Sequence, residues 1–84
     1  MKAVDPKKFG LNPRISLVEN NNSIGIVIDR KSRIIMKDGK RILDQSSIIM
    51  KKDKRSVFLL TSAPVCGKTK LFLSQNNISI KSLI

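Results

Sequence analysis

The residues best suited to chemistry lie together in one short stretch, Val57–Lys70. It contains the only cysteine of the chain, Cys66, and a lysine two positions later, Lys68. An uncharged run precedes the cysteine, which predicts a strand, a tight loop and the start of a helix. Free backbone N–H groups converge at a helix start, and a thiol placed there beside a lysine ionises more readily than usual. Cys66 is therefore a candidate reactive thiol, although single cysteines are more often buried structural residues.

The segment Ser62–Thr69 resembles the phosphate-binding loop G-x-x-x-x-G-K-[ST]. The resemblance implies that in Gly67–Thr69 the lysine would reach terminal phosphates and the threonine hydroxyl would meet Mg²⁺. Ser62 replaces the first glycine of the motif, however, and Pro64 removes one amide donor. No acidic residue follows Asp53 to hold a metal ion. We therefore expect a basic turn that caps a helix, without hydrolysis of ATP or GTP.

A second resemblance covers the same residues. The turn Ala63–Cys66, followed by Lys70–Leu73 and Asn76–Ile78, resembles the active-site turn and helix of glutaredoxins. In that motif, C-P-x-C, Ala63 occupies the position of the nucleophilic first cysteine, and only Cys66 matches. The resemblance therefore implies a single-cysteine redox role at most, without dithiol exchange.

A third resemblance concerns Asp29–Lys31, which is similar to the acid-x-lysine pair of metal-dependent nucleases. Those enzymes need a further acid upstream, and the chain offers only Asp5 and Glu19 there. With no histidine and six acidic residues in the whole chain, metal ligands and general bases are scarce. We expect no catalytic residue, no metal and no cofactor, and we interpret the tripeptide as a turn with solvated charges.

The basic surplus is the strongest functional signal. The formal net charge is +11, and Arg30–Arg55 holds ten lysines and arginines against three aspartates. That imbalance exceeds what solubility requires and favours a polyanionic ligand bound through its phosphates. The predicted anion-binding residues are Arg30, Lys31, Arg33, Lys40, Arg41, Lys51, Lys52, Lys54, Arg55 and Lys68.

Two kinds of partner fit this charge. Nucleic acid is the first, and the absence of Trp and Tyr argues against stacking on single strands, so duplex DNA or structured RNA is favoured. An acidic protein partner is the alternative, with the chain acting as a non-enzymatic accessory subunit of a larger complex. The sequence does not separate the two, because both would use the same lysines and arginines.

The first part of the chain predicts an arm and a hairpin. Residues 1–13 contain two X-Pro steps and a glycine, which predicts a basic irregular arm, either loose or lying on a partner. Arg14–Glu19 and Ile24–Asp29 are typical of strands, joined by an asparagine-rich turn. Arg33–Met36 is either a further strand or the end of one long bent strand.

The pair Asp38–Gly39 decides the fold class. Between apolar runs it is typical of a hairpin turn, which would give an all-β barrel. Alternatively, Asp38 is the N-cap of a helix over about Gly39–Lys52. In that helix Lys51 and Lys52 would lie at the negative end of the helix dipole, where positive charge is stabilising. We favour the helix because the spacing of four apolar residues suits a buried helical face: Ile42, Leu43, Ile49 and Met50.

The last third predicts a helix and a closing strand. Lys68–Gln75 should form the helix with Leu71 and Phe72 inward, and Asn76–Asn77 should end it in a left-handed conformation. Ile78–Ile84 alternates like a strand.

These elements predict one small α+β domain over residues 14–84, with a mixed sheet of about four strands and two short helices. The composition, 40% hydrophobic with three phenylalanines as the only aromatics, predicts an aliphatic core. No apolar run approaches 18 residues, and one cysteine fits a reducing compartment, so we expect a soluble cytoplasmic protein without a membrane partner. The oligomeric state stays open.

Overall fold

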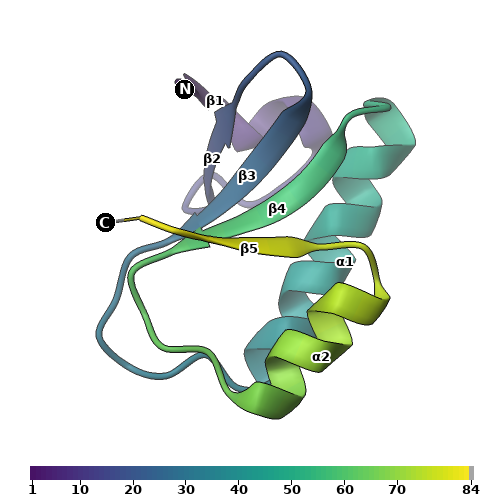
Figure 1. The fold of residues 1–84 in the computed structure, drawn as a ribbon. Coiled ribbons are helices and arrows are strands. Elements are labelled where there is room, and N and C mark those ends of the chain that lie inside the picture. Colours follow the sequence, from purple (N-terminus) through teal and green to yellow (C-terminus); the bar gives the residue numbers. More distant parts are fainter. Residues whose placement is uncertain (84) are drawn as a thin grey trace.

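A five-stranded mixed sheet organises the chain in the computed structural model, which describes residues 1–83 (Figure 1). The strands follow one another across the sheet in chain order. The first three run antiparallel, and the last two lie parallel to the third. The sheet is open, so the predicted α+β class is confirmed and the barrel alternative is wrong. The strands are β1 (Lys2–Val4), β2 (Ser16–Glu19), β3 (Ser23–Ile28), β4 (Ser56–Thr61) and β5 (Ser79–Ser82).

Two α-helices pack on one face of this sheet (Figure 1). Helix α1 (Met36–Lys52) connects β3 to β4, and helix α2 (Gly67–Gln75) connects β4 to β5. The predicted first helix is confirmed, but it begins three residues earlier than expected. Asp38 is consequently not the N-cap: it lies in the first turn, where its carboxylate accepts the Ile35 N–H at 3.0 Å. No helix within residues 1–83 is long and apolar enough to cross a lipid bilayer.

The predicted hairpin is present between β2 and β3. Asn20 closes its turn by accepting the backbone N–H groups of Asn22 at 2.9 Å and Ser23 at 2.7 Å. The segment Arg33–Met36 is neither a strand nor the end of a bent one. It makes a single parallel bridge, Ile34 to Val65, which joins the loop after β3 to the loop after β4.

The N-terminal segment differs from the irregular arm we expected. After β1, a short 3₁₀ helix η1 (Pro6–Phe9) follows its N-cap residue Asp5, whose side chain accepts the Lys7 N–H at 3.0 Å. Gly10 ends it with φ of 74°, a left-handed conformation that glycine adopts without strain. Phe9 and Leu11 are buried in the core, and this burial holds the segment in place.

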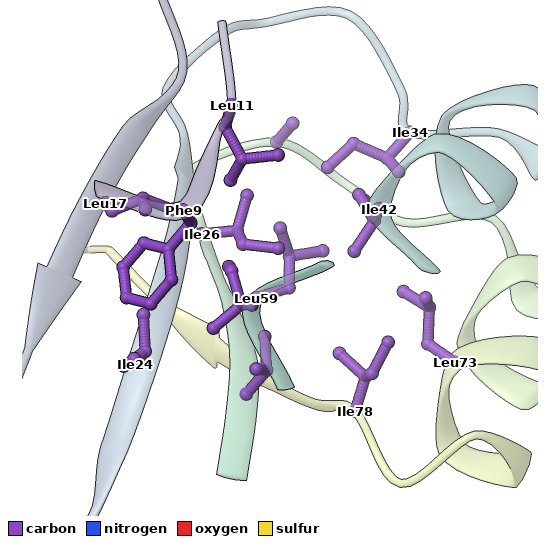
Figure 2. Close-up of a cluster of buried hydrophobic side chains, with 13 residues drawn as sticks. Phe9, Leu11, Leu17, Ile24, Ile26, Ile34, Ile42, Leu59, Leu73 and Ile78 are labelled. Atoms are coloured by element: carbon purple, nitrogen blue, oxygen red, sulfur yellow. The ribbon is translucent and has the colours of Figure 1, made fainter. Parts of the chain in front are cut away.

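The core lies between the sheet and the helices and is largely aliphatic, as predicted (Figure 2). Two expected contributors are not part of it: Met50 and Leu71 are 54% and 60% exposed. Helix α2 instead buries Thr69 and Leu73, which lie one turn apart. The core side chains are Phe9, Leu11, Leu17, Ile24, Ile26, Ile34, Ile42, Ile49, Val57, Leu59, Ala63, Leu73 and Ile78.

The two helices are in close contact at Gly39. A Cβ atom at this position would lie 2.9 Å from Thr69 Cγ2, closer than side chains tolerate. The absence of a side chain at Gly39 therefore lets α1 and α2 meet near their N-termini. The final strand ends at Ser82, and the predicted extension to Ile84 falls partly outside the described residues.

Candidate nucleic-acid interface

Most of the predicted anion-binding residues lie in or near the segments at the two ends of α1, and Figure 1 shows these two ends. With 17 residues and a rise of 1.5 Å per residue, this helix separates its ends by about 25 Å. We call the end near the loops after β3 and β4 the loop end, and the other the turn end. The loop end carries Arg30, Lys31, Arg33, Arg41 and Lys68, whereas the turn end carries Lys51, Lys52, Lys54 and Arg55. Lys40 is exposed on the second turn of α1, opposite the buried Ile42.

A cavity of about 480 Å³ opens at the loop end, between the β2–β3 hairpin and α1. The apolar part of its lining consists of four isoleucines and one valine: Ile15, Ile26, Val27, Ile28 and Ile42. Three arginines, Arg14, Arg30 and Arg41, share the lining with a single carboxylate, Asp38. The cavity therefore combines an apolar surface with an excess of positive charge.

Arg30 shapes the loop at this cavity. Its Nε donates to the Ser32 carbonyl at 3.1 Å, and its Nη2 donates to the Arg33 carbonyl at 3.1 Å. The same Nη2 lies 2.7 Å from Asp38 Oδ2. The predicted site residue Arg30 thus folds the loop after β3 and ties it to the first turn of α1.

Arg14 and Arg41, in contrast, have no acidic partner within residues 1–83, where the ion pairs are Arg30–Asp38, Arg55–Glu19 and Arg55–Asp53. Arg14 precedes β2, and its backbone is held by a 2.9 Å hydrogen bond from its own N–H to Asn12 Oδ1. Arg41 lies on α1, three residues after Asp38, so Arg41 and Asp38 share one face of the helix and both line the cavity.

The charge state of Asp38 follows from its neighbours. Hydrogen bonds from the Arg30 guanidinium and from the Ile35 N–H, with the nearby charge of Arg41, hold the pKa of this carboxyl below its ordinary value. Asp38 is therefore ionised at neutral pH and neutralises one of the three cavity arginines. The other two positive charges are left for a ligand.

The turn end is organised differently, because the Arg55 guanidinium is already paired with other residues of the protein. Its Nη2 lies 2.8 Å from Asp53 Oδ2 and 3.3 Å from Glu19 Oε2, and its Nη1 donates to the Asn20 carbonyl at 2.9 Å. The Arg55 guanidinium lowers the pKa of Asp53 to about 2. The remaining basic residues at this end, Lys51, Lys52 and Lys54, are exposed, and none of the three lines the cavity of about 550 Å³ that Arg55 shares with Lys2 and Glu19.

The acidic residues suggested by the nuclease resemblance do not converge. Asp29 follows β3 and accepts the Ser62 hydroxyl, while Asp5 caps η1. Glu19 pairs with Ile24 at the opposite end of the hairpin. Within residues 1–83, no group of three or more His, Cys, Asp or Glu side chains is close enough to hold a metal ion.

The loop between β4 and α2 also differs from a phosphate cradle. The Cys66 N–H is donated to the Ile34 carbonyl at 2.9 Å, and the Pro64 carbonyl accepts the Ile34 N–H at 2.9 Å. Thr69 is fully buried. The Cys66 amide is therefore occupied within the protein, and the Thr69 hydroxyl is enclosed.

Arg14 is the arginine of this cavity that sequence reasoning missed. It lies outside the Arg30–Arg55 segment and has no nearby motif. The only local signal is Asn12-Pro13 before it, which indicates a turn but does not indicate that α1 will pack beside that turn.

No family model and no curated protein matches this chain. Among solved structures, the fold is similar to that of EndoMS in its apo form, with a TM-score of 0.60 and 14% sequence identity. The match covers 82% of this chain and 32% of the EndoMS chain, so the present chain corresponds to about a third of that protein. At this identity the likeness shows the fold alone.

Proposed function

We propose that this domain binds nucleic acid through phosphate contacts, with the arginine-lined cavity as the main contact surface and without catalysis. The observation that carries this proposal is the placement of Arg14 and Arg41 beside one cavity with no acidic partner for either within residues 1–83. A guanidinium left without a carboxylate matches a phosphate group well, because its planar N–H groups can donate two parallel hydrogen bonds.

The other residues at the loop end extend this surface. Lys31, Arg33 and Lys68 are exposed in or next to the loops after β3 and β4, where they would contact further phosphates of the same ligand. The apolar wall formed by the isoleucines suits the sugar edge of a backbone rather than free phosphate. A formal net charge of +11 adds a long-range attraction toward any polyanion.

A DNA duplex is the first probe, because the chain has no Trp or Tyr on which the bases of a single strand could stack. Catalysis does not belong to the proposal. Asp5, Glu19 and Asp29 lie apart, so no pair among these carboxylates is available to hold the metal ions of a phosphodiester cleavage.

Fluorescence anisotropy of a short labelled duplex, measured over a series of salt concentrations, tests the proposal. We expect binding whose logarithmic salt slope falls by about two when Arg14→Gln and Arg41→Gln are combined. Removing each phosphate contact should weaken binding on the order of tenfold at about 0.1 M salt. The matched control combines Lys51→Gln with Lys54→Gln, which removes the same charge from the turn end.

Equal effects of the two double variants would contradict the cavity as the main contact. A chain that binds neither DNA nor structured RNA at low salt, but retains a protein partner from nuclease-treated lysate, would replace the proposal by the accessory-subunit alternative. Cleavage of the duplex would contradict the non-catalytic part.

A further inference from the structure

The loop-end cavity has the size of a site for one nucleotide unit. Its volume of about 480 Å³ lies within the range of small-molecule sites, about 300–1,000 Å³. An internal nucleotide of a duplex is continued on both sides and stacked between its neighbours, so entering the cavity would cost unstacking and unpairing. A nucleotide at the end of a strand is continued on one side only. The cavity volume therefore favours a strand end over the middle of a duplex.

The charge of the lining matches a terminal phosphate better than an internal one. Three arginines and one carboxylate, Asp38, leave an excess of two positive charges. An internal phosphodiester carries one negative charge, whereas a phosphomonoester carries about 1.5 to 2 at neutral pH and has three acceptor oxygens. Arg14 and Arg41 together can therefore neutralise one terminal phosphate.

The donors that would hold this group are not used within the protein. The guanidinium groups of Arg14 and Arg41 make no hydrogen bond or ion pair within residues 1–83, and both side chains are exposed. Gln45 lies one helical turn after Arg41 and also lines the cavity. Its side-chain amide has no hydrogen-bond partner in the same part of the chain. Helix α1 and the segment before β2 thus present unpaired donors to one cavity.

The apolar part of the lining suits a sugar better than a base. It consists of aliphatic side chains, and no aromatic ring lines the cavity for a base to stack on. The C–H groups of a deoxyribose can instead make van der Waals contacts with aliphatic side chains. A terminal phosphate and its sugar therefore fit the cavity while the base stays stacked in the duplex.

We propose that the loop-end cavity binds the phosphomonoester end of a nucleic-acid strand, with Arg14 and Arg41 on the terminal phosphate. This inference rests on the proposed function and narrows it from phosphates in general to a phosphorylated end.

Anisotropy measurements on internally labelled duplexes of one sequence and different ends test the inference. Duplexes that end in a 5′-phosphate, in a 3′-phosphate or in hydroxyl groups only are compared with a duplex closed by a hairpin loop at each end. We expect a phosphorylated duplex to bind about tenfold more tightly than the hydroxyl-ended and closed duplexes at about 0.1 M salt. Equal affinities for all of them would overturn the inference and leave the proposed function intact. Absence of binding to every duplex would instead contradict the proposed function.

A pair of double variants assigns the preference to the cavity. Arg14→Gln combined with Arg41→Gln should bring the affinity ratio of phosphorylated to hydroxyl-ended duplex to about one. Lys51→Gln combined with Lys54→Gln should weaken both duplexes alike and keep the ratio. All four side chains are exposed, and the melting temperature verifies that both variants are folded. A ratio that survives in the arginine variant would overturn the inference.

Deoxyadenosine 5′-monophosphate, used as a competitor, distinguishes a strand end from a free nucleotide. It carries the same phosphomonoester but lacks the contacts made along a strand. It should therefore displace the phosphorylated duplex only at concentrations far above those at which an unlabelled phosphorylated duplex does. Equal potency would overturn the assignment to a strand end and assign the cavity to free nucleotides.

The pH dependence of the preference identifies the recognised group. A phosphomonoester gains its second charge with a pKa of about 6. The chain has no histidine, and the titratable groups of the cavity are its three arginines and Asp38, whose pKa lies below its ordinary value. The preference for the phosphorylated duplex should therefore fall between about pH 7 and about pH 5, because the phosphate loses one charge. A preference that does not change over this range would contradict the recognition of a doubly charged phosphate.

Discussion

The two ends of α1 carry similar numbers of basic residues but use them differently. At the turn end, the arginine is enclosed by Asp53, Glu19 and the Asn20 carbonyl, and it joins the hairpin turn to the loop before β4. At the loop end, Arg30 performs the comparable structural task with Asp38. Two further arginines remain there without an acidic partner within residues 1–83. On the proposed binding mode, two unpaired arginines beside one cavity, rather than the number of basic residues, mark where an anion binds.

The ends also differ in how their cations are held. Arg14 and Arg41 extend from a turn fixed by Asn12 and from the body of a helix, and both line one cavity. Lys51 and Lys54 are exposed near the end of α1, and a flexible lysine loses more side-chain entropy for each hydrogen bond to a ligand than the planar guanidinium of an arginine does. A contact made by the cavity arginines should therefore stabilise a complex more than one made by these lysines.

The largest effect is expected from charge reversal in the cavity. Arg41→Glu removes one cation and places a second carboxylate near Asp38, so phosphate would meet repulsion. We expect duplex binding to weaken about a hundredfold at low salt, as for the removal of two phosphate contacts. Anisotropy titration measures this directly. Lys51→Glu makes the same charge change on the exposed side of α1 and should weaken binding by less than about fivefold, through net charge alone. The comparison fails if the two substitutions have equal effects.

A smaller effect of opposite sign is expected from Asp38→Asn. This change removes the only carboxylate of the cavity, while the asparagine oxygen can still accept the Ile35 N–H that begins α1. We expect duplex affinity to increase about threefold, as the net charge of the cavity becomes more positive. Asp44→Asn, on the exposed side of α1, controls for the change in total charge. A decrease in affinity would show that Arg30 needs its carboxylate partner to present the loop correctly.

The smallest expected effect concerns stability at the turn end. The folded pKa of Asp53 is about 2, below its unfolded value, so the unfolded chain binds more protons in acid. The stabilisation is present above about pH 4 and is lost as the pH falls toward 2. Urea unfolding across this range should show that Arg55→Gln reduces the loss of stability on acidification. An unchanged pH dependence in that variant would show that the Arg55–Asp53 contact does not form in solution.

Local signals in the sequence were sufficient for much of the fold. The asparagine-rich turn predicted the hairpin because Asn20 satisfies its backbone donors. Apolar spacing and Asp38 predicted α1. The N-terminal helix was missed although Asp5, Pro6 and Gly10 mark its two ends, because only the tertiary structure shows that Phe9 has a place in the core.

The candidate site was only partly predictable, for a physical reason. The charge-rich segment identified Arg30 and Arg41, but it also included Arg55, whose partners Glu19 and Asn20 come from a distant turn. Arg14 joins the site only because the hairpin packs beside α1. Pairing and convergence of this kind depend on contacts between segments, which composition and spacing do not describe.

The central claim is that nucleic acid binds at the loop end, and NMR chemical-shift mapping tests it most directly. An isotope-labelled full chain is titrated with a short DNA duplex at low salt. We predict that the largest shifts occur at Arg14, Arg41 and the loop 29–35, with small shifts over 51–56. The largest shifts at 51–56, with the cavity resonances unchanged, would contradict the account.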